Sequence, residues 1–101
     1  MTEYLQFGDS DRFIADYWIV SSTEGFLAFG QIYAAFGRGD EMMRIVTEGF
    51  TRKAGELGGP IVHEFIATNA RAKALVERTE GYVFSEKDHN GHPVYRKTFY
   101  P

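Results

Sequence analysis

The chain has 101 residues, of which 44% are hydrophobic and 16% aromatic, so its size predicts one domain with enough apolar surface for a core. The net charge is −3 with both signs interspersed, which argues against a protein that neutralises many phosphates, and nucleic acid is not an expected partner. Cysteine is absent, which excludes disulfides, thiolate metal sites and thiol nucleophiles.

The first part of the chain predicts a β-hairpin. Residues 12–22 and 26–36 are rich in β-branched and aromatic side chains, and the turn sequence at 23–25 separates them. Gly30 lies in the middle of the second strand, where a missing side chain lowers stability. We therefore expect a bulge or a close backbone approach at Gly30.

A helix is predicted after the GRG sequence at 37–39, because the period of the apolar residues changes there from 2 to 3.6. Asp40 and Glu41 lie in its first turn, where negative charge suits the helix dipole. The glycines before Pro60 end it. Its apolar stripe consists of Met43, Val46, Phe50, Ala54 and Leu57.

The next segments predict a strand and a second helix. The apolar run at 61–68 is typical of a short buried strand, and Asn69 is a favourable N-cap for a helix over 70–80. Gly81 is expected to close this helix. Its apolar stripe consists of Ala72, Leu75 and Val76.

The last segment, 82–100, predicts a second hairpin, and Asn90-Gly91 is the pair best suited to a two-residue type I′ turn. The predicted order is β-hairpin, α, β, α, β-hairpin, which is a mixed α/β fold (α+β, mixed sheet) within one domain over 1–101. Because a strand–helix–strand crossover is right-handed and parallel, we expect 26–36 and 61–68 to pair in parallel.

A second feature of the helix at 70–80 is a spaced motif that starts at its cap. The form NxxAxxLYxxxGF is matched at Asn69, Ala72 and Leu75, followed one residue late by Gly81 and Tyr82. This motif and the order of elements resemble the GNAT family of acyl-CoA N-acyltransferases over residues 13–100, without the helix pair that usually precedes the sheet. Short GNAT-like proteins of tailed bacteriophages are trimmed in a similar way.

The resemblance implies an enzyme that transfers an acetyl group from acetyl-CoA to an amine. The strands ending at Phe36 and Thr68 are then expected to splay apart, so that the pantetheine arm of the cofactor bonds between them like an extra strand. The pyrophosphate of the cofactor lies over the turn at 37–39 and the start of the first helix. The implied cofactor-binding residues are Gly37, Arg38, Gly39 and Asn69.

The phosphate loop departs from the family pattern, because only its two glycines remain and Asp40 and Glu41 follow at once. Two carboxylates satisfy the free amides of a helix start themselves and repel phosphate, so an ordinary capped helix is the alternative to an anion site. Asn69 likewise has a plain N-cap role as its alternative.

His63 and Glu64 are the candidate general bases. They are consecutive in a strand and point to opposite faces, so one of them is placed to face the acceptor groove. The alternative is a covered histidine with a backbone partner and a glutamate at the sheet edge.

Tyrosine is the expected donor of a proton to the departing thiolate. The family carries this tyrosine after the leucine of the motif, where this chain has Val76. Tyr82 is therefore the candidate catalytic acid, with Tyr33 and Tyr95 as further choices. The alternative for each is a core or interface tyrosine whose hydroxyl lies at the rim.

His89 and His92 flank the final turn as HNGH, with Asp88 beside them. These residues suit either a metal site or a solvated turn, and the turn is favoured because no rigid supporting shell is evident.

A second functional hypothesis is a catalytically inactive GNAT-fold protein that binds a partner or builds a structure. Examples are a phage virion component and an inhibitor of a host factor. The aromatic surplus in the first third of the chain favours an exposed patch, and hence a protein partner or a homo-oligomer.

The location of the protein is expected to be the cytoplasm. No apolar stretch approaches the roughly 20 residues of a membrane span, and the first residues lack the order of a secretion signal. If the chain is encoded by a phage, its expected location is the host cytoplasm or the virion. No membrane partner is expected.

Overall fold

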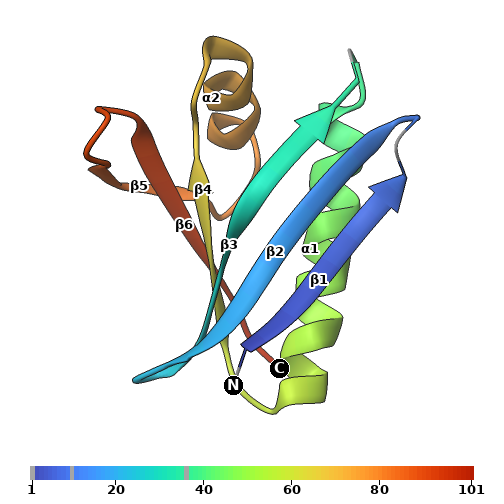
Figure 1. Ribbon diagram of the computed structural model, residues 1–101, viewed down its shortest axis with the longest axis vertical. Helices are drawn as coiled ribbons and strands as arrows, with labels where there is room; N and C mark the ends of the chain where they lie inside the picture. The colour runs from blue at the N-terminus through green and yellow to red at the C-terminus, as the bar shows by residue number, and fades with distance from the viewer. Residues whose placement is uncertain (1, 10, 36) are drawn as a thin grey trace.

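The computed structural model describes residues 2–9, 11–35 and 37–101. Within these residues, six strands form one mixed sheet in the order β1-β2-β3-β4-β6-β5, accompanied by two helices (Figure 1). The elements are β1 (Thr2–Asp9), β2 (Phe13–Ser22), β3 (Gly25–Ala34), α1 (Gly39–Leu57), β4 (Ile61–Ile66), α2 (Ala70–Glu77), β5 (Val83–Lys87) and β6 (Pro93–Phe99).

The predicted mixed α/β class is confirmed, and one strand was missed. β1 precedes the β2–β3 hairpin and pairs with β2 in antiparallel orientation from Thr2↔Val20 to Asp9↔Phe13. Its inward side chains, Leu5 and Phe7, pack against the core. Only these two apolar residues alternate toward the core, which is a weak signal for a strand.

The parallel pairing predicted across the first crossover is present but short. β3 and β4 pair only at Phe26↔Ile61, Leu27↔Val62 and Ala28↔His63. Figure 1 shows the two strands separating beyond this three-pair seam. β3 ends at Ala34 and β4 at Ile66, before the predicted ends at Phe36 and Thr68, and Phe36 lies outside the described residues.

One core fills the space between the sheet and the helices. Alternate residues of β2 are buried, and the predicted stripe of α1 is buried except at Leu57, which is partly covered. Helix α1 ends at Gly58, whose φ of 73° is the left-handed conformation predicted for its end. The buried residues of α2 are Leu75 and Val76.

Phe50 of α1 connects the two halves of the sheet. Its ring lies 5.6 Å from that of Phe7 and 4.9 Å from that of Tyr17 on the β1–β3 side. The same ring lies 5.0 Å from His63 and 5.4 Å from Phe99 on the β4–β6 side. The two halves therefore share one aromatic cluster across the seam.

Two predicted chain reversals differ in the structure. Helix α2 ends at Glu77 rather than beside Gly81. The hydroxyl of Thr79, and not its backbone N–H, donates to the carbonyl of Leu75 at 2.7 Å, and the N–H donates to the carbonyl of Val76 at 3.2 Å. The final hairpin has no two-residue turn. Its loop spans 88–92, where the Asp88 carboxylate accepts the N–H groups of Asn90 and His92 and holds a wider loop.

Candidate functional site

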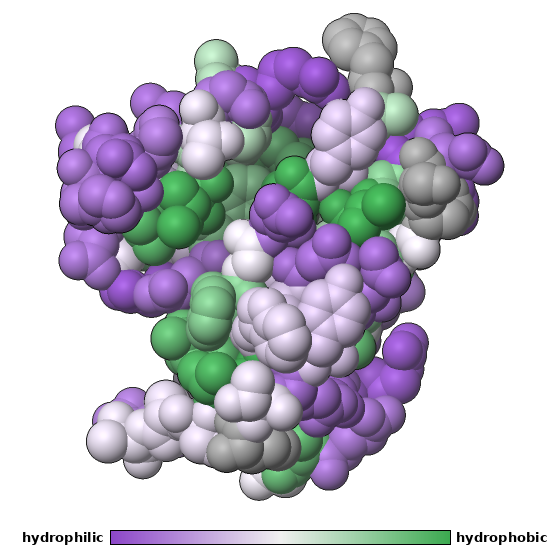
Figure 2. Space-filling model, viewed as in Figure 1, coloured by the Kyte–Doolittle hydropathy of each residue, from purple (hydrophilic) through white to green (hydrophobic). Residues whose placement is uncertain are grey.

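Two neighbouring pockets lie along the second half of β3, one toward the helices and one toward β4, and Figure 2 shows this face of the molecule hollowed. The helix pocket, of about 470 Å³, lies between the end of β3 and the helices and is lined by Tyr33, Gly37, Gly39, Asn69, Arg71 and Arg78, among others. The strand pocket, of about 420 Å³, is lined by Tyr17, Gly30, Gln31, His63, Glu64 and His92, among others. Ile32 lines both pockets, so they adjoin along β3.

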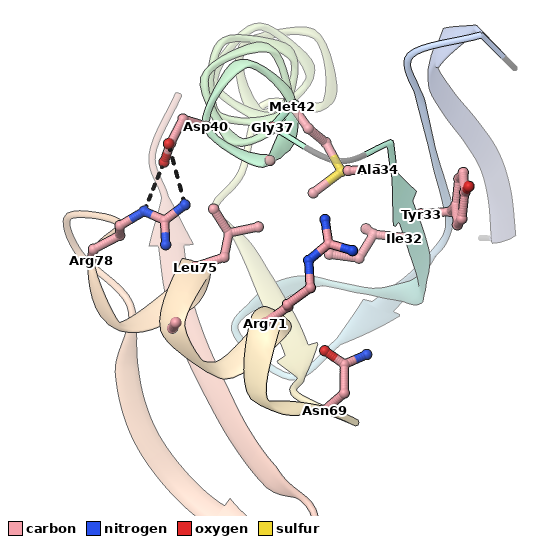
Figure 3. A pocket seen from close by; sticks show the side chains of 12 residues that line it. Ile32, Tyr33, Ala34, Gly37, Asp40, Met42, Asn69, Arg71, Leu75 and Arg78 are labelled. Atoms are coloured by element: carbon pink, nitrogen blue, oxygen red, sulfur yellow. Dashed lines mark hydrogen bonds and ion pairs between the residues drawn. The ribbon is translucent and has the colours of Figure 1, made fainter.

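The helix pocket brings together three of the four residues implied in cofactor binding. Gly37, Gly39 and Asn69 all line it, whereas Arg38 does not. Figure 3 shows the guanidinium of Arg71 reaching from α2 into the middle of the pocket. A cationic side chain and a helix start thus face the same space, which suits an anion.

The acidic pair at the start of α1 is matched by arginines. Arg78 donates two hydrogen bonds to the carboxylate of Asp40, at 3.0 and 3.2 Å, as Figure 3 shows. The carboxylate of Glu41 accepts a bond from Arg12 at 2.5 Å and a long one from Arg38 at 3.4 Å. These ion pairs offset the negative charge that was expected to repel phosphate.

Asn69 acts as the helix cap that its position predicts. Its Oδ1 atom accepts the backbone N–H of Ala72 at 2.9 Å, and its backbone is extended, as an N-cap requires. Because the same side chain lines the helix pocket, capping and contact with a ligand are compatible roles.

The strand pocket contains the close backbone approach predicted at Gly30. A Cβ atom built on Gly30 meets the carbonyl oxygen of Asp16 at 1.8 Å, which excludes every other residue type. The pairing of β2 with β3 runs through Tyr17↔Gly30 without a register shift, so the expected bulge is absent.

His63 and Glu64 point to opposite faces of β4, as predicted, and His63 is turned to the core. It is 1% exposed, and its Nδ1 atom lies 2.6 Å from the hydroxyl oxygen of Tyr82, in a hydrogen bond. Burial lowers the pKa of His63 to about 3 and raises the pKa of Tyr82, so both side chains are neutral at pH 7. His63 and Tyr82, two of the predicted catalytic residues, are therefore hydrogen-bonded to each other.

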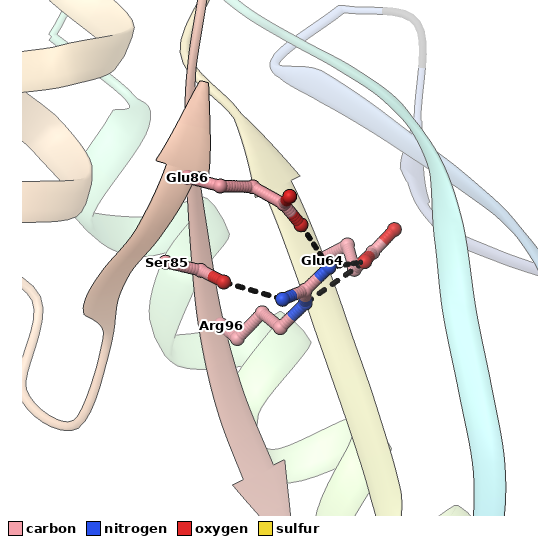
Figure 4. A network of polar contacts seen from close by, with 4 residues as sticks. All are labelled: Glu64, Ser85, Glu86 and Arg96. Carbon is pink, nitrogen blue, oxygen red and sulfur yellow. Dashed lines mark hydrogen bonds and ion pairs between the residues drawn. The ribbon is translucent and has the colours of Figure 1, made fainter. Parts of the chain in front are cut away.

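Glu64 lies on the other face, in a network with Arg96 (Figure 4). Its Oε2 atom accepts bonds from Arg96 Nε at 2.9 Å and Nη2 at 2.5 Å. Arg96 also bonds Glu86 at 2.8 Å and the hydroxyl of Ser85. Glu64 lines the strand pocket from this network, so its carboxylate is held in a fixed position.

Sequence reasoning missed three residues of the pockets: Arg71 in α2, Arg78 at its C-cap and Tyr17 of β2. Arg71 and Arg78 are two helical turns apart and share the face that lines the helix pocket, a spacing that was readable from the sequence. Tyr17 lines the strand pocket because its alternation places it inward. Nothing in the sequence indicates that its ring contacts His63 on β4.

The described residues contain no group of three or more His, Cys, Asp or Glu side chains that could hold a metal ion. His92 and Asp88 approach each other at 3.8 Å, and His89 is exposed. No helix in the described part of the chain is both long and apolar enough to cross a membrane.

Comparison with known proteins adds no relative. No protein-family model matches the chain, and neither a curated protein nor a solved structure gives a match. The function must therefore be argued from the site itself.

Proposed function

We propose that the chain binds an acyl-coenzyme A thioester between β3 and β4 and transfers the acetyl group to an amine, as the GNAT resemblance implies. The observation that carries the proposal is the seam of three residue pairs, after which the two strands part beside two adjoining pockets. Main-chain groups of parting parallel strands suit an extended arm that bonds like an added strand.

The phosphate end of this ligand is assigned to the helix pocket. Gly37 and Gly39 leave the backbone accessible at the start of α1, and Arg71 supplies positive charge from the opposite wall. Arg78 supports the binding of an anion indirectly, because it compensates the charge of Asp40. The pantetheine arm then follows β3 past Ile32, which borders both pockets.

The acyl end is assigned to the strand pocket. The amine nitrogen attacks the thioester carbonyl carbon, the C–S bond breaks, and coenzyme A leaves as a thiolate. Glu64 is the proposed acceptor of the proton from the amine, because it lines the pocket as a partly exposed carboxylate, whereas His63 is buried and neutral. Tyr82, the proton donor expected from the sequence, lines neither pocket and is hydrogen-bonded to the buried His63, so the thiolate is assigned its proton from solvent.

Titration calorimetry with acetyl-CoA tests this proposal. Wild-type protein is expected to release heat and to gain thermal stability on saturation. Arg71→Gln is expected to weaken binding about tenfold, because it removes a charged phosphate contact. Arg52→Gln is the matched control, since Arg52 is an exposed helix arginine outside both pockets. Absence of heat at millimolar acetyl-CoA contradicts the proposal.

One observation favours the alternative, a catalytically inactive binding protein. Tyr4, Trp18 and Phe29 are cross-strand neighbours on β1–β3, and they are 48%, 48% and 39% exposed. This aromatic row lies on the face that alternation turns away from the buried side of β2. Exposed aromatic rows are typical of protein partners or of self-association. Light scattering separates the two functions, because a monomer that binds acetyl-CoA tightly contradicts the alternative.

A further inference from the structure

Tyr17 of β2 carries a buried hydroxyl group without a partner. The residue is 1% exposed, and within the described residues its hydroxyl is the only fully buried side-chain nitrogen or oxygen that makes no hydrogen bond. Such groups destabilise a fold and are rare in native structures, so each one needs an explanation.

The ring of Tyr17 reaches across the sheet to the split. β3 lies between β2 and β4, yet the ring of Tyr17 contacts that of His63 on β4, with centroids 4.8 Å apart and planes at 86°. Gly30 is the cross-strand neighbour of Tyr17 on β3, and it presents no side chain to block this path. Phe50 packs on the same ring at 4.9 Å, which fixes its position.

The residues around Tyr17 connect it to the strand pocket. His63, whose ring packs on that of Tyr17, is hydrogen-bonded to Tyr82 at 2.6 Å. Tyr17, His63 and Gly30 all line the strand pocket, on the side where β3 and β4 part. Tyr17 therefore lies in the wall of the space assigned to the acyl group, with its hydroxyl buried in that wall.

We propose that the Tyr17 hydroxyl donates a hydrogen bond to the carbonyl oxygen of the acyl group bound in the strand pocket. This inference rests on the proposed function and identifies the residue that polarises the thioester. The hydroxyl donates without transferring its proton, and the bond strengthens as the amine attacks and the oxygen becomes negative. The hydroxyl is covered in this structure, so an entering ligand reaches it by displacing side chains at the pocket floor.

The protonation state of Tyr17 agrees with a permanent donor. Burial raises its pKa well above the ordinary value, and the nearby Tyr82 and Asp16 act in the same direction. The group therefore keeps its proton throughout the range in which an amine is acetylated.

The test compares two ligands on three proteins by calorimetry. Acetyl-CoA and S-ethyl-CoA have the same length, and only the first has a carbonyl oxygen. Wild-type protein is expected to bind acetyl-CoA about fivefold more tightly than S-ethyl-CoA, and Tyr17→Phe is expected to bind both equally. Tyr100→Phe is the control, because Tyr100 is a tyrosine that lies outside both pockets. It is expected to keep the wild-type ratio.

The melting temperature of Tyr17→Phe separately tests whether the hydroxyl lacks a partner in the folded protein. Because the lost hydroxyl has no partner, the variant is expected to melt at the wild-type temperature or above it. A lower melting temperature means that the hydroxyl is bonded within the fold, and it overturns the inference. An unchanged ligand ratio in Tyr17→Phe also overturns it and leaves the proposed function intact. Failure of wild-type protein to bind either ligand overturns both.

Discussion

The two pockets are built on opposite principles. The helix pocket is lined by the exposed ion pair of Arg78 with Asp40, which solvent screens and which contributes little to folding. The strand pocket rests on Tyr17, His63 and Tyr82, which are buried, neutral and packed ring against ring. Changes of charge at the helix pocket are therefore expected to act on ligand binding, whereas protonation of the buried cluster beneath the strand pocket is expected to act on the stability of the fold.

The largest expected effect is a loss of stability on acidification, caused by the buried His63 beneath the strand pocket. The folded-state pKa of His63 is about 3, below the ordinary 6.5, so its contribution to stability is present above pH 6.5 and is lost as the pH falls toward 3. At pH 4 the loss relative to pH 7 is expected to be about 3 kcal/mol. Urea unfolding at both pH values measures it.

Two histidine variants test whether His63 causes this pH dependence. His63→Gln keeps a neutral side chain of similar size, and it is expected to remove most of this pH dependence. His89→Gln changes an exposed histidine of the final loop and is expected to leave the pH dependence as in the wild-type protein. If all three proteins lose stability equally on acidification, His63 is not the group responsible.

Asn69 is expected to give an intermediate effect, because it serves both the fold and the helix pocket. Asn69→Ala is expected to lower the free energy of unfolding by about 1 kcal/mol through loss of the cap. Asn69→Ser keeps a capping oxygen and is expected to restore most of that stability. If the amide also contacts the cofactor, Asn69→Ser still binds acetyl-CoA more weakly. Wild-type affinity in Asn69→Ser shows a pure capping role.

The smallest effect is expected at the start of α1. Asp40→Asn removes a negative charge beside the helix pocket and frees Arg78, so affinity for acetyl-CoA is expected to rise about threefold at low salt. The melting temperature is expected to stay near that of the wild type, since the ion pair is exposed. Glu48→Gln on the same helix, outside both pockets, serves as the control. A fall in affinity contradicts the assignment of this pocket to phosphate.

The elements that the sequence predicts well are those with local signals. Helix α1 follows a stripe of period 3.6 and ends at a left-handed glycine, Gly58, so both its length and its end were readable. Asn69 caps α2 through its own side chain, again a local bond. The final loop was mispredicted because the Asp88 carboxylate organises it, and Asn90-Gly91 alone gives no sign of that.

The candidate site depends on contacts between distant parts of the chain, and these contacts could not be predicted from the sequence. The pairing of Arg78 with Asp40 joins α2 to α1, and each residue alone is typical of a solvated helix surface. The isolation of the Tyr17 hydroxyl follows from three strands and a helix packing together. Neither arrangement has a signature in residue spacing.

The ring of Phe50 packs where the two halves of the sheet are joined by only three residue pairs. Its ring contacts both halves, which also meet at the short seam between β3 and β4 and through the ring contact of Tyr17 with His63. Both halves pack on this one side chain, so a smaller residue at position 50 leaves a cavity between them. Phe50 lines neither pocket, so a change in its volume acts on the gap between β3 and β4 only by shifting the two halves of the sheet relative to each other.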